Sequence, residues 1–369
     1  MDLTTSSWSL LVEGNLTTVY NDQQYGNISN ALSDERLKNV NFVNALIIAR
    51  NIYVPAIALI GLAGNFISLA VFSMSHLRHV SSSGYLASLA CADNLFLLSM
   101  FITWLDGIVP ILVNRESCSF IMYVTYVSSF LSVWYVVCFT GERYIAICHP
   151  LHAPMIFSKL KEKFVIISFA VLSCIIYNFA FWTIDVSEFS HRKSCSMIPS
   201  IGDIMYVITW IDTVITMVLP FLLIVFMNVR IVWSVYRYQR KREKMVQATA
   251  RQKDSALKNR SQRRITRMLL LVSTTFLVLN LPSHVSRLEQ LLSTSSHNYL
   301  FKRLIHEIVL MLYYSTFSIN FFLYAIYGKH FKKSLSILVR NLCRRKKKFN
   351  SHDRWRSEVN RTSMTSLHK

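Results

Sequence analysis

Two acidic side chains lie inside long apolar stretches of this chain, and they are the first candidates for chemistry. Asp93 is the only charged residue in about 80–105, and Asp212 is the only one in about 204–229. A charged side chain at the depth of a bilayer is costly and usually marks function. Both positions therefore predict a role in binding or switching rather than in packing alone.

Seven apolar stretches would have to position these carboxylates. No residue between Glu116 and Glu142 is charged. Four further stretches lack Asp, Glu, Lys and Arg altogether, namely 51–77, 164–184, 268–286 and 308–328. A helix needs about 20 apolar residues to cross the hydrocarbon core of a membrane. The sequence therefore predicts an all-α membrane protein built as a seven-transmembrane helix bundle.

The charge of the chain is segregated between the loops, and this predicts its orientation. With the N-terminus outside, the inner segments hold 31 of the 40 Lys and Arg residues and 6 of the 20 acidic residues. Cytoplasmic loops of membrane proteins carry such an excess. We therefore expect a multi-pass plasma-membrane protein with an extracellular N-terminus and a cytoplasmic C-terminus. The net charge of +20 then reflects basic runs near anionic membrane lipids, and no nucleic-acid partner is expected.

The chain is predicted to have three parts. Residues 1–50 form an extracellular tail, 51–338 the seven-helix domain, and 339–369 a cytoplasmic tail. The end of the helical domain, 329–338, separates apolar from basic residues as a helix lying in the membrane interface does, and we expect a short amphipathic eighth helix there.

Several residues are candidates for covalent modification. Asn15 and Asn27 begin glycosylation sequons in the outer tail. Cys118 and Cys195 both face the oxidising side, so a disulfide between them is expected. Cys343 follows the amphipathic stretch, and palmitoylation or a solvated free thiol fit it equally well.

Several short motifs occur in a fixed order, each in its own apolar stretch. They are Gly64-Asn65, Leu89-Ala90-Cys91-Ala92-Asp93, Cys118, Glu142-Arg143-Tyr144, Pro220, Pro282 and Asn320-Phe321-Phe322-Leu323-Tyr324. Together they resemble the motifs of the rhodopsin-like (class A) G-protein-coupled receptors, over roughly residues 50–340. The chain departs from the family pattern at four places: Asn280 stands for a Trp, Phe321 for a Pro, Asn228 for a Tyr, and no Trp is found inside the fourth stretch.

The resemblance implies where a heterotrimeric G protein is activated. Arg143 would pair with Glu142 at rest and contact the G protein when freed. The resemblance assigns coupling and activation to Glu142, Arg143, Tyr144, Leu151, Pro282, Asn320 and Tyr324. Many family members hold the Arg with an acid at the inner end of the sixth helix, where this chain has Gln262-Arg263-Arg264. We therefore expect some ligand-independent activity.

The resemblance also places Ser132 and Asn320 against Asp93. Oxygen ligands suit a hard cation such as sodium. Asp93 with these two partners therefore predicts either a sodium-linked switch or a protonated carboxyl group in a polar network. No other cofactor is expected.

The ligand pocket implied by the resemblance is wide, polar and aromatic. Its expected residues are Trp104, Met122, Thr125, Tyr126, Ser129, Asp212, His284, Arg287, His306, Leu310 and Tyr314. Thr125 stands where amine receptors of the family have an Asp, which argues against an ammonium ligand. Arg287 would bind a peptide carboxylate or amide oxygen and Asp212 a basic side chain, unless the two pair with each other or with loop residues.

These features favour a receptor of the neuropeptide type over an enzyme, because no nucleophile–base pair, metal cluster or phosphate loop is found in the sequence. The expected partners are an extracellular peptide, a heterotrimeric G protein, membrane lipids and arrestin, which would bind a phosphorylated tail. Two alternatives remain: a chemosensory receptor of the same fold for a small molecule, and a seven-span transporter.

Overall fold

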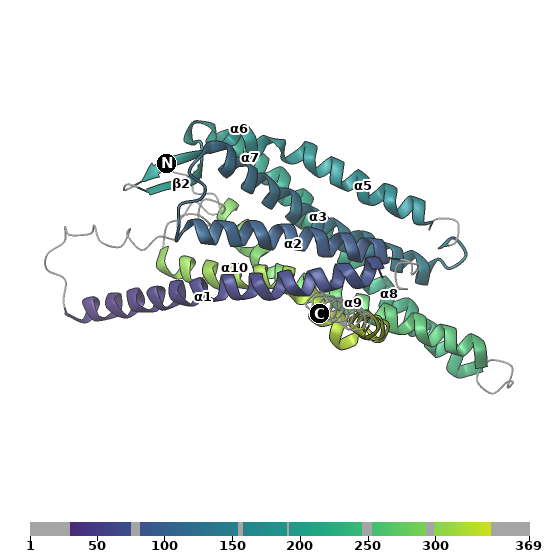
Figure 1. Ribbon diagram of the computed structural model, residues 1–369. Helices are drawn as coiled ribbons and strands as arrows, with labels where there is room; N and C mark the ends of the chain where they lie inside the picture. The colour runs from purple at the N-terminus through teal and green to yellow at the C-terminus, as the bar shows by residue number, and fades with distance from the viewer. Residues whose placement is uncertain are drawn as a thin grey trace, which may run out of the picture.

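The computed structural model describes residues 30–74, 82–153, 158–189, 192–245, 253–292 and 299–340. Within these ranges, seven helices are long and apolar enough to cross a membrane. They pack side by side into one elongated bundle, and a two-stranded hairpin closes one end of it (Figure 1). We call this end the hairpin end and the opposite end the far end. The predicted seven-transmembrane helix bundle is confirmed.

The first four spans run alternately along the bundle. They are α1 (Asn30–Met74), α2 (Ser83–Asp106), α3 (Arg115–Cys148) and α5 (Lys159–Ile176), the last extended by η3 (Tyr177–Phe179) and α6 (Ala180–Thr183). The α3 helix is the central one, since 61% of its most apolar window is buried, against 17% for the span Leu160–Thr183. The α3 helix is therefore the most enclosed of these four spans.

The remaining spans follow the hairpin. The hairpin consists of β1 (Ile184–Phe189) and β2 (Arg192–Met197), and after η4 (Pro199–Ile201) come α7 (Gly202–Thr213), η5 (Val214–Val218), α8 (Leu219–Met245), α9 (Lys253–Leu292) and α10 (Tyr299–Tyr327). The wide turn η5 has a local cause. Pro220 has no N–H to donate to the carbonyl of Thr216, and its ring would collide with that carbonyl, so the helix widens just before it.

A disulfide joins Cys118 at the start of α3 to Cys195 in β2. This confirms the predicted bond. The strands pair antiparallel, with Val186 opposite Cys195. Because Ser119 Oγ also donates to Ile184 O (3.2 Å), the hairpin is fixed over the hairpin end of α3 at two points.

Small residues let α1 approach α10 closely. A Cβ atom added at Gly64 would lie 2.8 Å from the Cβ of Phe321, and one added at Gly61 would collide with Ser318. Small residues at helix contacts are the usual means of close packing between membrane helices. Phe321, which replaces the proline of the resembled motif, thus packs against a glycine.

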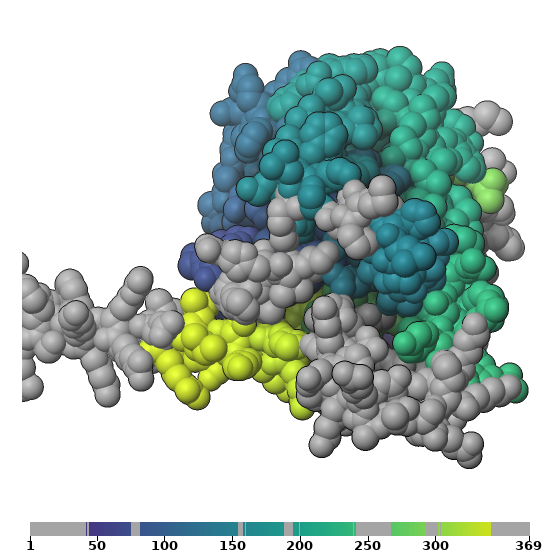
Figure 2. All heavy atoms as spheres, turned by 90° about the vertical axis from the view of Figure 1, so that its right-hand side faces the viewer, coloured from purple at the N-terminus to yellow at the C-terminus, as the bar shows by residue number. Residues whose placement is uncertain are grey.

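The chain continues as a helix over 329–340 after Gly328. Phe331 is buried there and packs against Phe72 and Tyr324, with ring centroids 5.4 and 5.6 Å apart. Lys332 and Lys333 are exposed. Figure 2 looks onto the far end, where this yellow segment lies on one side and the green atoms of α8 on the other.

Candidate ligand-binding and coupling sites

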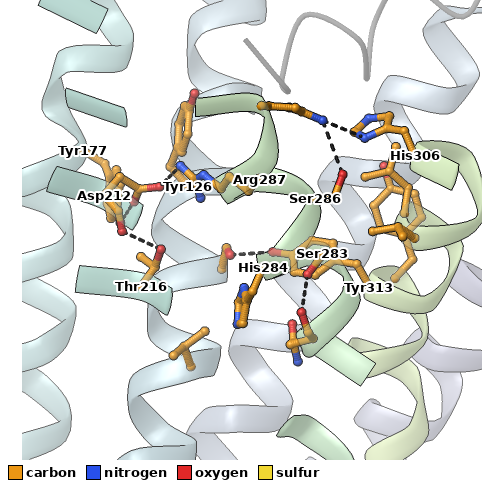
Figure 3. A pocket seen from close by; sticks show the side chains of 17 residues that line it. Tyr126, Tyr177, Asp212, Thr216, Ser283, His284, Ser286, Arg287, His306 and Tyr313 are labelled. Atoms are coloured by element: carbon orange, nitrogen blue, oxygen red, sulfur yellow. Dashed lines mark hydrogen bonds and ion pairs between the residues drawn. The ribbon is translucent and has the colours of Figure 1, made fainter. Parts of the chain in front are cut away.

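A cavity lies between α3, α7, α9 and α10. Eight of the predicted pocket residues line it, namely Tyr126, Ser129, Asp212, His284, Arg287, His306, Leu310 and Tyr314. Figure 3 shows their side chains converging from these separate helices. The helices meet here because their polar side chains would otherwise face lipid, where they find no hydrogen-bond partner.

Arg287 and Asp212 form an ion pair inside this cavity. Arg287 Nη2 lies 2.5 Å from Asp212 Oδ2, and Tyr177 Oη donates to the other carboxylate oxygen at 2.6 Å. Both oxygens of Asp212 are therefore occupied by donors. The mutual pairing of Asp212 and Arg287, one of the two alternatives open from the sequence, is the one found.

Beside this ion pair, one hydrogen-bond donor lacks an acceptor in the described part of the chain. Arg287 Nε is buried and has no hydrogen-bond partner among the described residues. A buried N–H without an acceptor is costly. A ligand that offers a neutral or negative oxygen at this point would satisfy it.

Aromatic rings form the wall beside the ion pair. Tyr126 and Tyr177 are stacked with ring centroids 5.5 Å apart and an interplanar angle of 4°. Tyr126 also borders a second, smaller cavity under the hairpin, lined by Met122, Ile184, Met197 and Met205 among others. Tyr126 thus lies between the two cavities.

Three predicted pocket residues lie elsewhere. Met122 lines the smaller cavity. Thr125 donates to Ile121 O of its own helix (2.8 Å), and Trp104 packs near Phe101; neither lines either cavity. The direction of each side chain around its helix decides this.

Other lining residues were missed from the sequence. They are Val133, Tyr177, Thr216, Asn280, Ser283, Ser286, Gln290, Val309 and Tyr313. Tyr177 is the most informative of these, since it reaches Asp212 from the end of the fourth span. The helical repeat offered a signal on α9, because Asn280, Ser283 and Gln290 each lie three or four residues from His284 or Arg287.

A polar link runs from the cavity toward the middle of the bundle. Asn280 lines the cavity and donates to Phe276 O (2.7 Å) and to Thr316 Oγ1 (3.3 Å) of α10. The position expected to carry a Trp thus holds an amide that joins α9 to α10.

Asp93 is fully buried between α3 and α10. Ser132 Oγ donates to Asp93 Oδ1 (2.6 Å), and Asn320 Nδ2 donates to Asp93 Oδ2 (2.8 Å). The carboxylate and the Ser132 hydroxyl are oxygen ligands of the kind a hard cation takes. The amide of Asn320 faces Asp93 through its nitrogen, so it stabilises the carboxylate instead of adding a third oxygen. Elsewhere in the described ranges, no cluster of three or more His, Cys, Asp or Glu side chains is close enough to hold a metal.

Arg143 is buried toward the far end of α3, and its guanidinium contacts a serine of α2. Its Nη2 and Nε atoms lie 2.6 and 3.0 Å from Ser82 Oγ, at the start of α2. Glu142 Oε1 is 3.4 Å from Nη2. Arg143, Glu142 and Ser82 are all buried. The expected Glu142–Arg143 pair is present, and Ser82 is a partner that the motifs did not indicate.

Three of the other predicted coupling residues, Leu151, Tyr144 and Tyr324, lie around this end, whereas Asn320 contacts Asp93 in the middle of the bundle. Leu151 is 86% exposed, and Tyr144 contacts His149 through its hydroxyl (3.3 Å). Tyr324 is buried against Phe72 and Phe331. Pro282 lies within α9, two residues after Asn280, well away from Arg143 in the chain. Asn15, Asn27 and Cys343 lie outside the described residues.

Residues 64–324 match the family described as "7 transmembrane receptor (rhodopsin family)". The chain is 28% identical over 280 residues to the neuromedin U receptor homolog nmur-2 of Caenorhabditis elegans, covering 68% of this chain and 67% of that protein. It is 27% identical over 315 residues to the FMRFamide receptor of Drosophila melanogaster, covering 76% and 52%. A third match, to the thyrotropin-releasing hormone receptor of Gallus gallus, is 33% identical over 133 residues and covers 32% of each chain.

These similarities have two consequences. The matched family and relatives consist of receptors, so the expectation that the chain is not an enzyme is confirmed. The chain spans about two thirds, half and one third of the lengths of these three relatives, respectively.

Proposed function

Because the chain belongs to the rhodopsin family of seven-transmembrane receptors, we propose that it is a receptor for an extracellular neuropeptide that activates a heterotrimeric G protein. The hairpin end then faces the outside, and the far end faces the cytoplasm. The segregation of Lys and Arg along the sequence supports this orientation.

The observation that carries the peptide assignment is the charge-paired, aromatic cavity. A peptide backbone brings carbonyl and amide groups that need hydrogen bonds, and its side chains need apolar or aromatic surface. The cavity offers Arg287 Nε, several hydroxyl groups, and the rings of Tyr126 and Tyr313. Relatives named for neuromedin U, FMRFamide and thyrotropin-releasing hormone support the same class of ligand.

The ion pair restricts which chemical group of a ligand can bind Arg287. Asp212 already cancels the charge of Arg287. A ligand carboxylate would therefore bring an uncompensated negative charge into a largely buried site, which is costly. A neutral carbonyl, such as that of a C-terminal carboxamide, satisfies Nε without adding charge. We infer that the peptide presents an amide oxygen to Arg287.

Signalling would proceed by a shift between two conformations of the bundle. The peptide must bind the open conformation more tightly than the closed one, because a ligand shifts an equilibrium only through its differential affinity. Opening frees Arg143 from Ser82 and Glu142, so that it contacts the G protein together with Leu151. An exposed aliphatic side chain such as Leu151 is the kind of anchor that fills a pocket on a partner.

Further partners follow from the same proposal. Sodium would bind at Asp93 with Ser132 and favour the closed conformation. Arrestin would bind the tail after its serines and threonines are phosphorylated. Membrane lipids would contact the basic helix at 329–340.

The test is a calcium and cyclic-AMP response in cells that express the chain, screened against a neuropeptide library. The wild type and the Arg143→Ala variant are measured side by side at equal surface expression. A peptide response that disappears in Arg143→Ala is the expected result. Good surface expression without a response to any peptide would overturn the proposal and favour a small-molecule chemosensor.

A further inference from the structure

Ser82 has an unusual backbone at the far end of the bundle. Its φ and ψ angles are 73° and −5°, and it is the one non-glycine residue with positive φ in the described part of the chain. This left-handed region is disfavoured for residues with a Cβ atom. Such outliers persist where the surrounding structure holds them, and they gather at functional and switching sites.

Ser82 also does not cap the first turn of α2 with its side chain. It immediately precedes α2, where a serine side chain usually caps the first turn of the helix, yet its side chain makes no capping hydrogen bond. The N–H of Gly84 donates instead to Glu162 Oε1 of α5 (2.8 Å). A Cβ atom at Gly84 would lie 2.5 Å from that oxygen, so the glycine admits the carboxylate.

The hydroxyl of Ser82 is thereby left for Arg143. A serine oxygen has two lone pairs, and here it accepts from both Nε and Nη2 of the guanidinium, at 3.0 and 2.6 Å. These contacts are shorter than the 3.4 Å to Glu142. Because Ser82 is 1% exposed and Arg143 5% exposed, water cannot readily replace the serine.

The sequence of α9 offers no acidic alternative. Asp254 is the second residue of α9 and Glu289 lies in its last turn, and no Asp or Glu occurs between them. Over these residues α9 has no carboxylate that could hold Arg143. Ser82 restrains Arg143 from α2, beside Glu142 on α3 itself, and the α5 carboxylate Glu162 fixes the start of α2.

We propose that Ser82 is the resting-state acceptor that holds Arg143 in the closed conformation, in place of an acidic residue on α9. This positioning role rests on the proposed G-protein coupling. It revises the expectation of ligand-independent activity: the wild type signals little without ligand, and removal of the Ser82 hydroxyl raises that signal.

The first test measures ligand-independent signal per surface receptor. Ser82→Ala and Ser82→Gly both remove the hydroxyl, and the glycine also tolerates the left-handed backbone. Ser82→Asn keeps an acceptor and tolerates the same backbone. A hydrogen bond to a charged group contributes enough to shift a conformational equilibrium roughly tenfold. We expect a several-fold rise for Ala and Gly, and wild-type signal for Asn.

Two controls separate this role from general destabilisation. Ser99→Ala removes another buried α2 hydroxyl, which donates to Leu95 O of its own helix (2.9 Å), and should leave the basal signal unchanged. Ser82→Ala combined with Arg143→Ala should signal no more than Arg143→Ala alone, because the effect passes through the guanidinium.

A second readout does not depend on any G protein. Met268, in the far half of α9, is 8% exposed. In the purified full-length chain, the Met268→Cys thiol should react faster with a maleimide when Ser82→Ala is added, and no faster when Ser99→Ala is added. The rate of the chain without Met268→Cys is subtracted as background.

The two readouts separate the possible failures. Unchanged labelling and unchanged basal signal in Ser82→Ala and Ser82→Gly, with normal surface expression, would overturn the role of Ser82. Faster labelling without a response from any class of G protein would keep the role of Ser82 and overturn the proposed coupling. Equal rises for Ser82→Asn and Ser82→Ala would show that the acceptor is not what matters.

Discussion

Asp212 and Arg287 neutralise each other in the ligand cavity, and at the scale of single residues this pairing sets ligand selectivity. The carboxylate is satisfied by Tyr177 and Arg287, whereas the guanidinium keeps one buried N–H to offer. The cavity should therefore prefer a neutral acceptor to an anion.

We predict that the receptor prefers a peptide carboxamide to the same peptide as free acid, and that Asp212→Asn reduces this preference about tenfold, or ~1.4 kcal/mol. Without Asp212, the charge of Arg287 is free to attract a carboxylate. Each active peptide from the library screen and its free acid form the pair to measure by competition binding.

Tyr177→Phe is the matched control for this prediction. It removes one donor to Asp212 but keeps both charges and the stacking on Tyr126. The amide preference should survive in Tyr177→Phe. An equal loss of preference in both variants would mean that geometry, not charge, sets the selectivity.

A second residue-scale prediction concerns Asp93. Its two oxygens accept from Ser132 and Asn320. Asp93→Asn keeps the size of this side chain and removes its negative charge. Agonist affinity of the wild type should fall as sodium replaces a bulky organic cation at constant ionic strength, and that of Asp93→Asn should not. Sodium dependence that persists in the variant would contradict a cation site at Asp93.

At the scale of elements, each cavity is completed by an irregular piece of chain. The widened turn η5 and the short helix η3 bring Thr216 and Tyr177 to the ligand cavity, and the hairpin closes the smaller cavity next to it. These elements are irregular where Pro220 breaks the hydrogen-bond ladder and where the fourth span ends.

The disulfide should matter for ligand binding more than for the fold of the bundle. Cys118→Ala and Cys195→Ala each release the hairpin from α3, and such a bond typically contributes about 2–4 kcal/mol. We expect a large loss of peptide affinity, measured by radioligand binding. The double variant should be no worse than either single one, since both remove the same bond; an additive loss would point to separate roles of the two thiols.

The whole molecule is a bundle of seven spans whose two ends have different tasks. The ligand cavity lies near the hairpin end, Asp93 lies between the ends, and Arg143 lies at the far end. The central α3 helix contributes to all three places through Tyr126, Ser132 and Arg143. A movement of α3 would therefore change the geometry of both the ligand cavity and the Arg143 site.

Orientation is testable at this scale. In the proposed orientation the first tail faces outside, and its sequons at Asn15 and Asn27 should carry glycans. Asn15→Gln and Asn27→Gln should then each increase gel mobility, as glycosidase treatment does. The sequons at Asn259 and Asn360 are internal controls that should stay unmodified. A glycan at Asn259 or Asn360 would contradict the proposed orientation.

The amino-acid sequence by itself determined the seven spans, the disulfide and the candidate charged residues. Span length and charge segregation depend on composition alone, because the bilayer imposes a fixed thickness and a cost on every buried charge. Eight of the eleven pocket residues that the family resemblance implied line the cavity.

Only the tertiary structure decided which of these side chains meet. The pairing of Asp212 with Arg287 and Tyr177 joins three spans, and no local rule of sequence spacing could choose it over a ligand contact. The same holds for Ser82: its hydroxyl reaches Arg143 because Glu162, from a third helix, has taken over the capping of α2. Such contacts depend on helix rotation and on competition among partners distant in sequence, which exist only once the bundle is packed.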